Sequence, residues 1–284
     1  MSFAETVLLG AIAGSTIYLG LPLGRIGQVS DRVRVALAMF SVGILAFIFM
    51  DVTNHGVGIV DTALANFKDH KAGLGHVLGL FALLAAGFTV GTAGISGVER
   101  TMRRRGREVA PIAGGDATQE FSSADLTTFA LDARRAALRT SMTIAVAIGL
   151  HNFAEGLAIG VSAQAGAIGL ATVLIIGFGL HNATEGFGIV GPLGGVRPSW
   201  GWLALAGVIG GGPTVLGTIV GYQVHSDALE LCFYALAGGA ILYIVGEIWT
   251  AMRRYGYRTL GLYCLSAGFL VGVATDLIVS YGGG

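Results

Sequence analysis

Eight long apolar stretches limit the folds that this chain can adopt. An apolar helix of about 20 residues crosses the hydrocarbon core of a bilayer, because a helix satisfies its backbone hydrogen bonds internally. Only 12% of the residues are charged, about half the fraction that a soluble domain uses to cover its surface. The sequence therefore predicts an all-α membrane protein with eight transmembrane helices. The predicted spans are residues 4–23, 33–51, 73–97, 136–162, 166–190, 200–222, 229–252 and 259–280.

Glycine is abundant and proline is rare, with 47 and 5 residues respectively. Small residues allow membrane helices to approach closely, so we expect one compact bundle that forms a single integral membrane domain. Helices one to three fall within residues 1–97, and helices four to eight within residues 136–284. Residues 98–135 are rich in Gly, Ser, Thr, Asp and Arg, and we expect them to form a flexible loop.

Basic residues are distributed very unevenly between the two sides of the predicted bundle. Of the 17 Lys and Arg residues, all but Lys68 and Lys71 lie in or beside alternate loops, beginning with the first loop. Because basic loops stay in the cytoplasm, we expect the 98–135 loop to be cytoplasmic and both termini to be extracytoplasmic. The net charge is zero, which gives no general attraction to nucleic acid.

Two of the predicted spans carry nearly the same hexapeptide. It reads HNFAEG at residues 151–156 and HNATEG at residues 181–186. The His and the Glu, four residues apart, share one helix face, and the Asn lies about 100° around the helix from the His. His151 is about 18 Å along its helix from Arg139. His181 is about 22 Å from the other end of its span, so both motifs lie near the middle of a core about 30 Å thick.

The two motif glutamates need a compensating charge at this depth. An ionised carboxylate in hydrocarbon costs at least a few kcal/mol, and a divalent cation would offset that cost. Mixed His and Glu ligands suit zinc, and also iron, manganese, cobalt or cadmium. We therefore predict a metal site formed by His151, Glu155, His181 and Glu185. The alternative is that the histidines and glutamates satisfy only one another.

A few other polar residues in the apolar stretches are weaker candidates. Asp51 lies at the outer end of the second span with His55 four residues on, where an ion would enter. Glu247 lies deeper, in the seventh span, and is a candidate for the ion pathway. Asp276 lies close enough to the outer boundary of the eighth span for hydration alone to explain it.

Taken together, these features resemble the ZIP (Zrt/Irt-like) family of metal transporters, in its bacterial branch. The likeness covers the whole chain: eight spans, outward termini, a long cytoplasmic loop after span three, and paired HNxxEG-type motifs in spans four and five. It implies a bacterial inner-membrane protein that moves zinc, or iron, manganese or cadmium, toward the cytoplasm. The metal is then a substrate, no reaction is catalysed, and the four motif His and Glu residues are the transport-site ligands. The resemblance also implies homodimers and an elevator-like movement of a transport bundle.

The chain departs from the family pattern at four positions. Ala154 and Thr184 replace the proline that usually precedes the motif glutamate. Asn182 and Gly212 replace two residues that supply carboxylates to a second metal in many bacterial members. We therefore expect a mononuclear site, with Asn152 and Asn182 as neutral ligands.

Two other functions fit the same pattern. A membrane-embedded metalloenzyme would use the metal to activate water, although the chain lacks the HExxH order, and no Ser or Cys nucleophile stands beside a base within a span. A proton or organic-ion carrier would use the His/Glu pairs as a relay. The sequence does not rank zinc against iron or manganese, because the same ligands bind all three.

Overall fold

The chain folds as a bundle of long helices. The computed structural model describes residues 1–26, 29–97, 100–101, 123–164, 179, 181–223 and 226–281. Within these parts every regular element is a helix, and seven helices are long and apolar enough to cross a membrane. This confirms the prediction of a multi-pass all-α membrane protein. Of the remaining predicted span, 166–190, only residues 179 and 181–190 are described, and these are helical; the eighth span stays a prediction.

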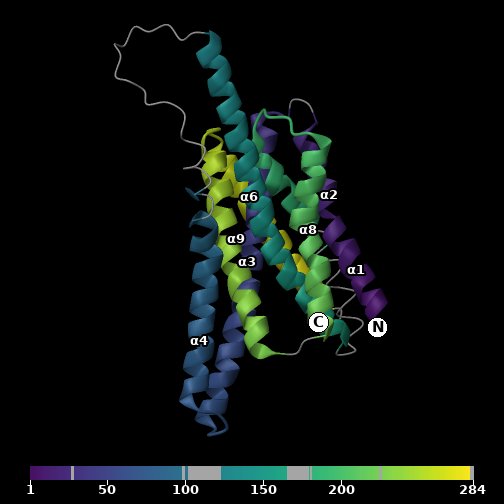
Figure 1. Ribbon diagram of the computed structural model, residues 1–284, viewed down its shortest axis with the longest axis vertical. Coiled ribbons are helices and arrows are strands. Elements are labelled where there is room, and N and C mark those ends of the chain that lie inside the picture. Colours follow the sequence, from purple (N-terminus) through teal and green to yellow (C-terminus); the bar gives the residue numbers. More distant parts are fainter. Residues whose placement is uncertain are drawn as a thin grey trace, which may run out of the picture.

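The helices run roughly along the long axis of the molecule (Figure 1), and both chain ends lie at the same end of the bundle. The elements in chain order are α1 (Phe3–Ser15), α2 (Ile17–Gly20), η1 (Leu21–Gly24), α3 (Asp31–Lys68), α4 (Leu74–Thr89), the π-helical η2 (Val90–Gly94), α6 (Ser123–Gln164), helical residues 181–190, η3 (Gly191–Leu193), α8 (Trp200–Gln223), α9 (Asp227–Arg253) and α10 (Arg258–Tyr281).

Two groups of helices meet at the centre of the bundle. In one group α8 packs against both α6 and α1, and in the other α3 packs between α9 and α10, with α4 along α9. The contact between α6 and α9 joins the two groups. The residues that carry the paired motifs, α6 and 181–190, are therefore surrounded by other helices.

Glycines bring the helix backbones into direct contact, as the composition predicts. A Cβ atom on Gly156 of α6 would lie 2.0 Å from the carbonyl oxygen of Thr214 in α8. A Cβ atom on Gly268 of α10 would likewise lie 2.0 Å from the carbonyl oxygen of Phe40 in α3. Since real Cβ atoms do not approach this closely, both crossings depend on the missing side chain.

The helix that contains the second predicted span, residues 33–51, is much longer than the span itself. Hydropathy placed its end at Asp51, whereas α3 continues to Lys68. No proline interrupts the residues between, and the helix ends only where His70 adopts a left-handed backbone with φ of 57°. Hydropathy marks the part of a helix that suits lipid, but the helix itself continues until its backbone is broken. The lower end of α3 forms a hairpin with α4 (Figure 1).

The predicted loop at residues 98–135 is also wrong in its second part. Helix α6 begins at Ser123, so residues 123–135 are helical. The stretch ALDARRAAL at residues 130–138 consists mainly of strong helix formers, whereas the Gly, Ser, Thr and Asp content of the whole 98–135 segment led to the prediction of a loop. Residues 102–122 of the predicted loop lie outside the described residues.

Replacing Gly268 with Ala tests the close crossing of α10 and α3. The added methyl group meets the backbone of Phe40, so we expect the free energy of unfolding to fall by roughly 1–3 kcal/mol. Gly246→Ala in α9 is the matched control, because nothing lies within 4 Å of a Cβ atom there. The control should be neutral or slightly stabilising. Thermal unfolding in detergent measures both variants, and equal effects would contradict the packing described.

Candidate functional site

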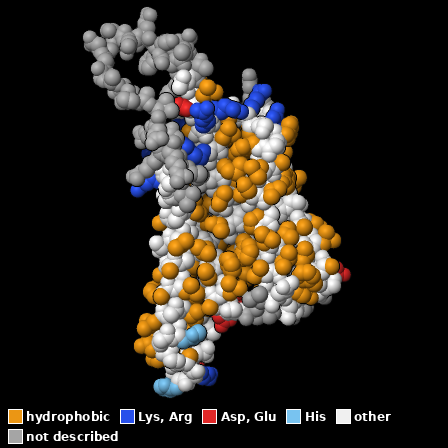
Figure 2. All heavy atoms as spheres, in the orientation of Figure 1, with side chains coloured by type: hydrophobic (Ala, Val, Ile, Leu, Met, Phe, Trp, Pro, Cys, Tyr) orange, Lys and Arg blue, Asp and Glu red, His pale blue; other side chains and the backbone are white. Residues whose placement is uncertain are grey.

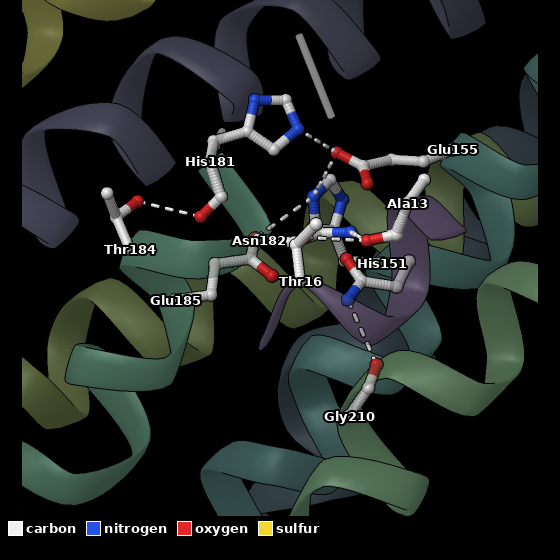
Figure 3. Close-up of polar contacts among 10 residues, drawn as sticks. Ala13, Thr16, His151, Glu155, His181, Asn182, Thr184, Glu185 and Gly210 are labelled. Carbon is white, nitrogen blue, oxygen red and sulfur yellow. Dashed lines mark hydrogen bonds and ion pairs between the residues drawn. The ribbon is translucent and has the colours of Figure 1, made fainter. Parts of the chain in front are cut away.

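The two hexapeptide motifs meet inside the bundle. Helix α6 supplies His151 and Glu155, and residues 181–190 supply His181 and Glu185; the four side chains point toward one another (Figure 3). His181 Nε2 donates a hydrogen bond to Glu155 Oε1 at 2.6 Å. His151 Nε2 lies 3.1 Å from Glu155 Oε1 and 3.5 Å from Glu185 Oε1. The structure therefore brings together the four residues that the repeated spacing singles out.

The cluster is almost completely shielded from the surface of the bundle. His151 and Glu185 have no exposed side-chain area, and the side chain of Glu155 is 3% exposed. The side chain of His181 is 14% exposed, so it is the member of the cluster nearest to an outside route. Helix α6 runs without a break through the first motif and past Ala154.

The two buried carboxylates lack a fixed positive partner. In the described parts of the chain no lysine or arginine forms an ion pair with Glu155 or Glu185; the charged contacts come from the two histidines, and the Asn152 side chain also lies near Glu185. Glu155 Oε2 and both oxygens of Glu185 accept no hydrogen bond from a described residue. Burying an unpaired acceptor or charge costs several kcal/mol, so the cluster attracts a proton or a cation.

The two asparagines are held with their oxygen atoms free. Asn152 Nδ2 donates to the carbonyl oxygen of Gly210 in α8 at 2.9 Å, and Asn182 Nδ2 donates to that of Ala13 in α1 at 3.2 Å. Because a carbonyl oxygen only accepts, these contacts fix which end of each amide is NH₂. Oδ1 of each asparagine is buried and has no hydrogen-bond donor among the described residues. Both amide oxygens are therefore free to accept a ligand, and the Asn152 side chain lies near Glu185.

The carbonyls that hold the asparagines lie at irregular turns of their helices. Pro213 in α8 cannot donate to the carbonyl of Ile209, and its ring crowds the turn that contains Gly210. The first predicted span breaks at Thr16, which separates α1 from α2 and directs both its backbone N–H and its Oγ1 to the carbonyl of Ala13. Sequence reasoning missed these two carbonyls. Pro213 was a usable signal for the turn in α8, whereas nothing in the apolar first span marks the break at Thr16.

The separations within the cluster can be compared with those around a metal ion. Two ligand atoms bound to one tetrahedral zinc at about 2.0–2.1 Å lie about 3.3 Å apart. The distances from His151 Nε2 to the two glutamates, 3.1 and 3.5 Å, match this value. The 2.6 Å contact between His181 Nε2 and Glu155 Oε1 is shorter and would have to open. Accordingly, no set of three or more His, Cys, Asp or Glu side chains in the described residues is already arranged to hold a metal ion.

Asp51 and His55 lie on α3, outside the cluster. His55 Nδ1 is 3.0 Å from the backbone oxygen and 3.5 Å from Oδ1 of Asp51, and both side chains are exposed. Asp51 lies within electrostatic range of Asp276 on α10 and of Glu155 and His181 in the cluster. Asp51 is therefore close enough to the cluster to interact electrostatically with His181, the cluster residue with the most exposed side chain.

Glu247 and Gly212, which the sequence also singles out, lie in α9 and α8. Glu247 is half-buried toward the end of α9, and its place in a pathway stays a prediction. Gly212 precedes Pro213, and a Cβ atom on it would meet only Val208 of the same helix among the described atoms. A side chain at position 212 would thus begin away from the neighbouring helices.

Comparison with known proteins found no relative of this chain. No protein-family model matches the chain, and no curated protein matches it. The function has to be argued from the cluster itself.

Replacing Glu185 with Gln separates the two explanations of the cluster. If Glu185 is an uncompensated carboxylate, then Gln removes a buried charge without changing shape. In a chelator at pH 8 the free energy of unfolding should then rise by roughly 1–3 kcal/mol. Asp132→Asn, at an exposed ion pair with Arg135, is the control and should change it by less than about 0.5 kcal/mol. A loss of stability in Glu185→Gln would show that the histidines already satisfy the glutamate.

Proposed function

We propose that the chain is a ZIP-type transporter that moves a divalent transition-metal ion toward the cytoplasm, with zinc as the first candidate. The observation that carries the proposal is the buried set of two imidazoles, two carboxylates and two amide oxygens with unsatisfied acceptor atoms. A divalent ion neutralises both carboxylates and accepts the histidine nitrogens as ligands. Cys232 and Cys264 are free and lie outside the motifs, so the ligand set consists of nitrogen and oxygen.

The proposed orientation of the chain in the membrane follows from the charge distribution. The two chain ends at one end of the bundle support an even number of crossings, and therefore the eight-span topology with residues 166–190 as the fifth span. Basic side chains gather at the opposite end of the apolar surface (Figure 2), which fits a cytoplasmic face. With this topology the chain is a bacterial inner-membrane protein with extracytoplasmic termini, and the dimer and elevator movement of the ZIP family are part of the proposal.

The exposed pair on α3 supplies an entry point. Asp51 and His55 lie near the middle of α3, and Asp51 is in electrostatic range of Glu155 and His181. A cation attracted by Asp51 would next meet His181, the cluster residue with the most exposed side chain. In this scheme Glu247, nearer the basic end of α9, belongs to the exit side.

A transporter also needs to release its cargo. The 2.6 Å hydrogen bond between His181 and Glu155 competes with metal binding, because the same Nε2 atom either donates to the carboxylate or coordinates the ion. The protein can therefore exchange a ligand-to-metal bond for a contact within the cluster when the ion leaves. This balance favours a carrier over a resident metal centre that drives catalysis.

Uptake of radioactive zinc into proteoliposomes tests the transport function. His181→Ala removes a proposed ligand, so we expect the initial rate at low zinc concentration to fall at least roughly tenfold. His76→Ala, which removes an exposed histidine at the start of α4, is the matched control and should keep the wild-type rate. Undiminished uptake in His181→Ala, or no metal-dependent uptake in the wild type, would contradict the proposal.

Metal stoichiometry tests the mononuclear site. Asn182 supplies an amide where a second metal would need a carboxylate, so isothermal titration calorimetry should detect one high-affinity zinc per chain. Glu155→Gln should abolish that binding phase, because it removes the carboxylate that contacts both histidines. Two tight equivalents per chain would rule out the mononuclear site.

A further inference from the structure

A cavity opens between three helices at the basic end of the bundle, far along the helices from the histidine and glutamate cluster. It lies where α3 begins, α9 ends and α10 begins, and its volume is about 380 Å³. Val35, Met39, Trp249 and Met252 line its apolar part, and Arg253 and Arg258 stand at its rim. The cavity therefore combines an apolar floor with a strongly basic edge.

The two rim arginines differ from other arginines of the chain. Arg34 pairs with Asp31 at 2.6 Å, and Arg135 pairs with Asp132 at 3.3 Å. In the described residues, the guanidinium groups of Arg253 and Arg258 form no ion pair and no hydrogen bond. Two positive charges without a carboxylate partner at the mouth of a cavity favour an anionic ligand.

The position of the cavity identifies the kind of anion. The basic side chains at this end lie where the apolar surface of the bundle stops (Figure 2), which is the level of lipid headgroups. Trp249 in the wall is the residue type that anchors helices at this interface. A small soluble anion would contact only the arginines at the rim and leave the apolar floor uncovered. A lipid instead packs its acyl chain against the floor and places its phosphate at the rim.

We propose that this cavity is a binding site for one anionic phospholipid. The first carbons of an acyl chain pack against Met39 and Met252, and the headgroup phosphate lies between Arg253 and Arg258. A zwitterionic lipid fits the apolar part but leaves the two arginines with less than a full counter-charge. The site therefore selects lipid by headgroup charge, and it contacts the ends of three helices at once. The inference depends on the membrane location of the chain and not on metal transport.

Trp249 provides a direct probe of occupancy. Replacing Trp200 and Trp202 with Phe leaves Trp249 as the single tryptophan of the three in the chain. This variant is placed in phosphatidylcholine vesicles with increasing amounts of brominated phosphatidylglycerol or brominated phosphatidylcholine. Bromine quenches tryptophan on contact, so we expect phosphatidylglycerol to bind with at least about threefold preference.

Charge variants test whether the arginines cause the preference. In the single-tryptophan background, Arg253→Gln with Arg258→Gln should bring the ratio of the two lipids to about one, whereas Lys at both positions should keep it above one. Arg134→Gln with Arg135→Gln removes equal charge at the same end and should leave the preference unchanged. Thermal unfolding confirms that each variant is folded.

Three results would overturn the proposal. They are equal quenching by both lipids in the parent variant, a preference that survives the double Gln substitution, and loss of the preference when inorganic phosphate is added at millimolar concentration. The last result would show that the rim binds free phosphate without regard to the lipid chain.

Discussion

Two glutamate carboxylates inside an apolar bundle, without a lysine or arginine to neutralise them, set the central constraint on this protein. Glu155 shares one oxygen between two histidines, while both oxygens of Glu185 lack a hydrogen-bond donor among the described residues. A fold does not gain stability from such an arrangement, so its presence calls for a ligand of opposite charge. The surrounding structure can be understood as the support that holds these oxygens in place.

That support comes from close helix contacts and from two irregular turns. Glycines let α6 and α8 approach until their backbones touch, which brings the Gly210 carbonyl within reach of Asn152. The break at Thr16 gives Asn182 the Ala13 carbonyl. Each amide thus donates its NH₂ group to a backbone carbonyl, and its buried oxygen accepts no hydrogen bond from a described residue. Two neutral acceptors beside two anionic ones suit a divalent cation better than a proton relay, which needs alternating donors and acceptors.

The helical membrane fold and the four central residues of the cluster could be predicted from the sequence. Apolar length predicted the helical membrane fold, and the i, i+4 spacing of His151/Glu155 and His181/Glu185 predicted that these four side chains converge. The ends of α3 and α6 were mispredicted, because hydropathy reports the preference for lipid and not where a helix stops. The Ala13 carbonyl could not be predicted, since a break in an apolar helix depends on tertiary contacts.

The central claim is that the His/Glu cluster binds a divalent metal ion. X-ray absorption at the zinc edge of the zinc-loaded protein tests it most directly. The account predicts a shell of nitrogen and oxygen ligands at about 2.0–2.1 Å with the scattering pattern of two imidazoles, and loss of one imidazole in His151→Ala. A sulfur shell at about 2.3 Å, or a zinc environment unchanged in that variant, would contradict it.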